Sequence, residues 1–120
     1  MRDGDPLEAE VMTAQDPVRP LDLAKRLVLI GEGLAENRRT QISDASIRVL
    51  REQVADMRMD IRNEQTLIGY EATCLVECIA ELAFARTDQD ANRESRAICY
   101  VNSLTGFMRG DVMRAEKALS

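Results

Sequence analysis

The chain has 120 residues and a formal net charge of −5, with 45% hydrophobic and 31% charged residues. This balance is typical of one globular domain and excludes a chain that is disordered throughout. The chain contains no histidine, so Ser-His and Cys-His catalytic arrangements, histidine general bases and histidine metal sites are all excluded.

Residues 1–19 contain five acidic residues, two arginines and two prolines, a composition that predicts a flexible acidic arm. Residues 20–120 then form a single all-helical domain. The opening stretch "MRDGDPLEAEV" is acidic and polar where a secretory signal needs an apolar core. The cysteine count of three is odd, which argues against a disulfide framework. We therefore expect a cytoplasmic protein.

The first helix is predicted from Pro20, a residue suited to a first helical turn, to about Asn37. Leu29 falls among the charged positions of this helix, so we expect its side chain to be exposed. The opposite side carries an apolar stripe made of Leu23, Leu27, Ile30 and Leu34.

The region from Ser43, a plausible N-cap, to Arg86 contains one glycine and no proline. Because its polar run "RNEQT" contains no turn chemistry, the pattern favours one continuous helix over residues 44–86, with a break in that run as the alternative. Apolar residues in its first part step by three and four, and we name these five residues the seam: Ile47, Leu50, Val54, Met57 and Ile61.

The seam is only about 80° wide, which is the two-per-heptad pattern of a contact with one other helix. That helix is either the protein's own first or last helix, or the same helix of a second copy across a two-fold axis. The second part of the region, "TLIGYEATCLVECIAELAFA", is apolar over roughly 220° and should be surrounded by other helices.

The last helix follows the polar loop "TDQDANRES" and keeps its apolar phase through Gly106 and Gly110, so we expect it to be continuous. No segment shows the two-residue period of a β-strand. The predicted fold is all-α: a small helical bundle with one long central helix or a helical pair, associated as a homodimer.

The cysteine and arginine patterns do not indicate a catalytic, metal or nucleic-acid site. Cys74 and Cys78 lie one helical turn apart and are interpreted as buried free thiols, whereas Cys99 is an exposed thiol or one covered by a partner. The arginines at 48, 51, 58 and 62 alternate with acids, and the net negative charge repels phosphate. We expect no enzymatic activity, cofactor, metal, small-molecule substrate or direct nucleic-acid contact.

Two further patterns concern membranes and partners. The most apolar stretch is interrupted by Glu71, Glu77 and Glu81, so we expect no membrane span. Several apolar residues fall outside the predicted core stripes and need covering by a partner, which makes them candidates for a binding surface: Leu29, Val49, Met59, Tyr100 and Phe107.

In "LAKRLVLIGEGLAENRR" and "YEATCLVECIAELAFAR", and in its size and acidity, the chain resembles the small helical quorum-sensing antiactivators of Gram-negative bacteria, the QslA type. The resemblance implies a cytoplasmic homodimer that binds a LuxR-type transcription regulator and blocks its dimerisation and DNA binding. An acidic dimeric chaperone or adaptor of a secretion system is the alternative, and it would bind a secreted protein instead.

Overall fold

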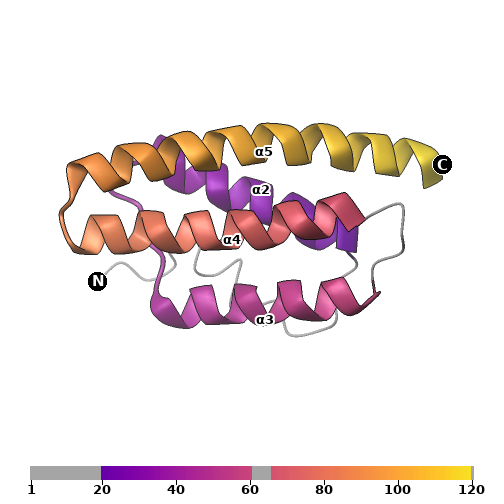
Figure 1. Ribbon diagram of the computed structural model, residues 1–120, viewed down its shortest axis with the longest axis horizontal. Helices are drawn as coiled ribbons and strands as arrows, with labels where there is room; N and C mark the ends of the chain where they lie inside the picture. Colours follow the sequence, from indigo (N-terminus) through magenta and orange to yellow (C-terminus); the bar gives the residue numbers. More distant parts are fainter. Residues whose placement is uncertain (1–19, 61–65, 120) are drawn as a thin grey trace.

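The computed structural model describes residues 20–60 and 66–119, and within them the chain forms four α-helices (Figure 1). They are α2 (Pro20–Glu36), α3 (Asp44–Asp60), α4 (Thr66–Thr87) and α5 (Ala91–Leu119). The predicted class, an all-α small helical bundle, is confirmed for this part of the chain. The predicted acidic arm at 1–19 and the seam residue Ile61 lie outside the described residues.

Short polar segments set the helix ends. Ser43 is the N-cap of α3, as predicted, because its Oγ accepts a hydrogen bond from the amide of Ser46 at 3.1 Å. Asp90 caps α5 in the same way, accepting from the amide of Arg93 at 3.1 Å. Just after α4, Gln89 has a φ of 56°, the left-handed conformation in which many helices end.

The expectation of one continuous helix over residues 44–86 is wrong, because α3 and α4 lie side by side and antiparallel (Figure 1). Arg51 of α3 forms an ion pair with Glu77 of α4, and further along α3 the guanidinium of Arg58 lies 5.4 Å from the ring centre of Tyr70. Helix propensity and missing turn residues are local signals, whereas burial of two apolar surfaces against each other is a tertiary effect that overrides them.

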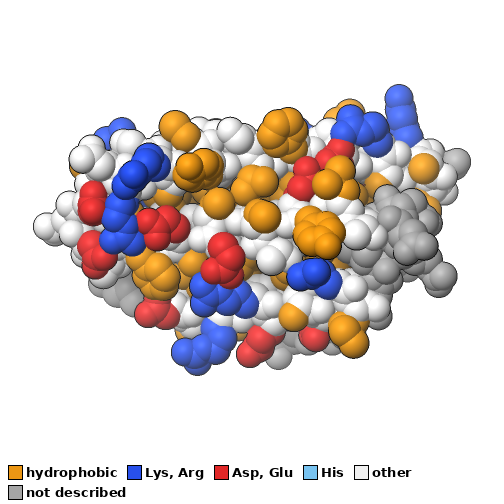
Figure 2. Space-filling model, viewed as in Figure 1, with side chains coloured by type: hydrophobic (Ala, Val, Ile, Leu, Met, Phe, Trp, Pro, Cys, Tyr) orange, Lys and Arg blue, Asp and Glu red, His pale blue; other side chains and the backbone are white. Residues whose placement is uncertain are grey.

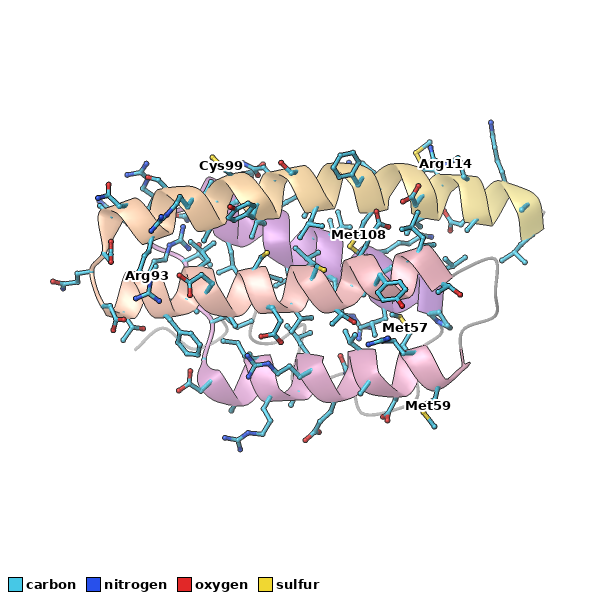
Figure 3. All side chains as sticks on the ribbon, viewed as in Figure 1. Met57, Met59, Arg93, Cys99, Met108 and Arg114 are labelled. Atoms are coloured by element: carbon cyan, nitrogen blue, oxygen red, sulfur yellow. The ribbon has the colours of Figure 1, made fainter. Side chains whose placement is uncertain are left out.

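The seam packs inside a single chain. Its described members Ile47, Leu50, Val54 and Met57 are all buried, with Leu50 fully inaccessible. Figure 3 shows Met57 between α3 and α4. The helix that covers the seam is mainly α4, which is neither the first nor the last helix expected from the sequence, and the first helix, α2, makes a smaller contribution. A second copy is therefore not needed to cover these four residues.

Helix α4 is the most enclosed element, as its wide apolar arc predicts. It packs against α5, α3 and α2. Helix α5 runs through Gly106 and Gly110 without a break, which confirms the prediction of a continuous last helix. All four helices contribute to one core cluster, which places α4 in its middle and α5 along one edge.

At Gly31 three helices, α2, α4 and α5, come close together. A Cβ atom built there would lie 3.1 Å from Thr105 Cγ2, 3.2 Å from Val101 Cγ1 and 3.4 Å from Leu75 Cδ1. A Cβ at Gly106, on the outer side of α5, would meet nothing within 4 Å. Gly31 therefore lets α2 pack closely on α4 and α5, whereas Gly106 has no such role.

These two glycines give a matched test of the packing. Alanine at either position gains about 1 kcal/mol of helix propensity, but at residue 31 it also meets overlap that costs about 1–3 kcal/mol. We expect the free energy of unfolding of Gly31→Ala to lie about 1–3 kcal/mol below that of Gly106→Ala, measured by urea denaturation. Equal values for the two variants would contradict this account of the helix contact.

Candidate protein-binding face

Exposed side chains on α4 and α5 recur every seven residues, which is close to two helical turns and keeps them on one side of each helix. On α4 the series is Leu67, Cys74 and Glu81, and all three are exposed. On α5 the series is Arg93, Tyr100, Phe107 and Arg114, of which Arg93 is half-buried and the other three are exposed.

The two series face the same side of the molecule. At one end Arg93 Nε donates to Glu81 Oε2 at 2.9 Å, and a second bond from Nη2 to Oε1 is 3.0 Å long. At the other end Leu67 and Arg114 line one pocket between the helices. Figure 3 shows Arg93 and Arg114 near opposite ends of α5.

We define the α4–α5 face by five apolar side chains: Leu67, Tyr70 and Cys74 on α4, and Tyr100 and Phe107 on α5. Tyr100 is 62% exposed and Phe107 is 65% exposed. Figure 2 shows hydrophobic side chains gathered over both helices on this side of the molecule. The face combines aromatic and aliphatic surface on two adjacent helices, so it can bury apolar area against another protein.

Two carboxylates beside the face, those of Glu77 and Glu81, are paired with arginines. Glu77 accepts two hydrogen bonds from Arg51, each 2.9 Å long, and Arg93 bonds Asp88 as well as Glu81. Hydrogen bonds from Arg51 and Arg93 lower the pKa values of Glu77 and Glu81 respectively, so both carboxylates stay ionised at neutral pH. The paired charges give the face a polar border.

Glu71 is half-buried on α4. Its Oε1 atom has no hydrogen-bond partner among the described residues. Burial raises the pKa of this carboxyl group, and the nearby charge of Arg114 partly opposes the rise. Arg114 thus acts on Glu71 through its charge, although it donates no hydrogen bond to this oxygen.

The five predicted partner-binding residues do not form one surface. Tyr100 and Phe107 lie on the α4–α5 face, but Met59 is 85% exposed and points away from α4 on the outer side of α3 (Figure 3). Val49 is half-buried and packs against the core, so its predicted exposure is only partial. Leu29 is exposed, as expected, but belongs to a different surface.

That surface is a groove between α2 and α5 with a volume of about 290 Å³. Leu29 and Met113 both line the groove. Two ion pairs cross from α2 to α5 beside it, Lys25 with Glu116 and Glu32 with Arg109. The groove is therefore small and bordered by charges that already neutralise one another.

Sequence reasoning missed the α4 part of the face. The apolar arc predicted for this helix includes Leu67, Tyr70 and Cys74, yet all three are exposed. Glu77 and Glu81 could have indicated this exposure. Charged side chains favour the solvent side of a helix, and residues three or four positions away lie on the same side. The interpretation of Cys74 as a buried thiol is wrong.

The other two thiols differ from each other in exposure. Cys78 is half-buried, and Cys99 is exposed on the edge of α5 away from α4 (Figure 3). Among residues 20–60 and 66–119, no group of three or more His, Cys, Asp or Glu side chains is placed to hold a metal ion. No described helix combines the length and apolar character needed to cross a bilayer.

No protein-family model, curated protein or solved structure matches this chain.

The ion pair at the end of the face can be tested by titration. In Arg93→Gln the pKa of Glu81 should rise toward its ordinary value, because the hydrogen bond to the ionised form is lost. In the unaltered protein this ion pair is complete above that ordinary value and is lost as pH falls through the lowered pKa. Carboxyl ¹³C NMR measures the shift, and Arg51→Gln, the matched control, should move only Glu77. A Glu81 titration that is unchanged in Arg93→Gln would contradict the assigned pairing.

Proposed function

We propose that this protein is a non-enzymatic cytoplasmic regulator that binds a LuxR-type transcription regulator and blocks its dimerisation and DNA binding. The observation that carries the proposal is the α4–α5 face, on which Tyr100 and Phe107 are more than half exposed. The resemblance to quorum-sensing antiactivators supplies the class of partner. The face supplies the means of contact.

The face has the composition of an interface centre. Aromatic side chains contribute large apolar areas, and tyrosine is enriched among the residues that dominate binding energy. The paired charges of Glu77 and Glu81 border this centre, where polar groups exclude water without large energetic contributions of their own. Burial of Tyr100 and Phe107 against a partner would therefore provide most of the affinity.

Inhibition by such a contact is competitive. An antiactivator must occupy the surface through which the regulator pairs with its second copy, with an affinity near that of the contact it replaces. The net charge of −5 favours approach to a basic DNA-binding protein. Homodimerisation stays a prediction, and it would need a surface other than the four buried seam residues.

Substitutions on the face and away from it separate this proposal from non-specific binding. Tyr100→Glu and Phe107→Glu should each weaken binding to a purified LuxR-type regulator of the source bacterium by about 2 kcal/mol, roughly thirtyfold. Met59→Glu is the matched control, since Met59 is also exposed but points away from the face. Titration calorimetry measures the affinities, and circular dichroism shows that the variants keep their helices.

Equal losses in all three variants, or none in Tyr100→Glu and Phe107→Glu, would show that the face is not the contact. If none of the LuxR-type regulators binds the unaltered protein, the proposed function is wrong. Binding of a secreted protein to the same face would then support the chaperone alternative.

A further inference from the structure

Cys74 and Cys78 form a pair of neighbouring free thiols on α4. Residues four apart on a helix have Cβ atoms roughly 5–6 Å apart on the same side. The two thiols are close enough for each to influence the other, because Cys74 is among the causes that raise the pKa of Cys78. Cys78 packs against the core while Cys74 is exposed, so one sulfur is held by its neighbours and the other is accessible.

This spacing favours a bridging ion over a disulfide. A disulfide needs Cβ atoms about 3.5–4.5 Å apart, closer than one helical turn places them, so bonding the two sulfurs would distort α4. An ion between the two sulfurs lengthens the bridge by two metal–sulfur bonds. A bridge of this length fits between side chains that lie one helical turn apart.

The number and type of ligands select the ion. Structural Zn²⁺ sites take four ligands, but the residues the structure describes place no third Cys, Asp or Glu side chain to complete a site with this pair. Thiolates are soft ligands and favour Cu(I), which accepts two sulfurs in a nearly linear arrangement. A reducing cytoplasm, expected from the cysteine count, would keep copper in this oxidation state.

We propose that Cys74 and Cys78 form a two-coordinate Cu(I) site on the exposed side of α4. Binding exchanges two S–H bonds for two Cu–S bonds and releases two protons to solvent, with no change in the oxidation state of copper or sulfur. The site lies on the α4–α5 face, although copper binding itself does not depend on the proposed partner. It goes beyond the sequence interpretation, which assigns no metal to these cysteines.

A competition titration tests the site. The full chain, reduced and kept under anaerobic conditions, is added to the coloured complex of Cu(I) with bicinchoninate, and loss of colour reports transfer of copper to the protein. We expect transfer of one Cu(I) per chain. Cys74→Ser and Cys78→Ser should each weaken binding at least tenfold, whereas Cys99→Ser, which alters an exposed thiol on α5, should not.

A second competition titration uses Zn²⁺ in place of Cu(I), with a zinc indicator as the competitor. We expect the protein to withdraw no Zn²⁺ under conditions in which it withdraws a full equivalent of Cu(I). Circular dichroism confirms that each variant is folded. If Cys78→Ser loses helical structure, the copper affinity of Cys74→Ser alone tests the site, because the Cys74 side chain is exposed and is not part of the core.

Three results would overturn the proposal: copper binding that survives in Cys74→Ser, an equal loss in Cys99→Ser, or equal retention of Zn²⁺. None of these involves the regulator. The copper site and the proposed function therefore succeed or fail separately.

Discussion

The structure depends on the burial of α4 against three other helices. Its side chains at Leu75, Ile79 and Leu82 are inaccessible to solvent, and the close approach of α2 at Gly31 brings a third helix onto them. Burial on this scale is the dominant favourable term in folding. The antiparallel arrangement of α3 and α4 follows from this burial, because it covers the seam of α3 and one side of α4 at the same time.

Polar contacts fix the ends of this packing. The guanidinium of Arg86, whose side chain is only 7% exposed, bonds Glu94 at 2.7 Å and the backbone oxygen of Thr40 at 2.8 Å. These contacts join the end of α4, the start of α5 and the connection before α3. A buried charge without its partner is costly, so this cluster also restricts how the three segments can be arranged.

The exposed surface follows from the same constraint. Once three helices cover α4, a single stripe of it remains accessible, and this stripe lies beside the side of α5 that carries Tyr100 and Phe107. The ion pair between Glu81 and Arg93 fixes the two helices relative to each other at one end. Leu67, Tyr70 and the exposed thiol of Cys74 lie on the part of α4 that no helix covers, whereas Cys78 lies at its margin and packs against the core.

Helix positions could largely be predicted from the sequence, because apolar period, the Ser43 cap and the absence of strand patterns are local properties. The reversal between α3 and α4 could not, since the intervening residues have no turn signature and the seam does not specify which helix covers it. The exposure of Tyr100 and Phe107 followed from their phase on α5. Whether Tyr70 and Cys74 contribute to the α4–α5 face depends on which side of α4 the neighbouring helices leave uncovered. Only the packing of the helices decides that.

The central claim is that the protein acts through the α4–α5 face. NMR mapping tests it most directly: backbone amide shifts are recorded while the ligand-binding domain of a LuxR-type regulator is added. The account predicts the largest changes near Leu67 to Cys74 and near Tyr100 to Phe107, with little change around Met59. Largest changes on the outer side of α3, or at the groove beside Leu29, would contradict it.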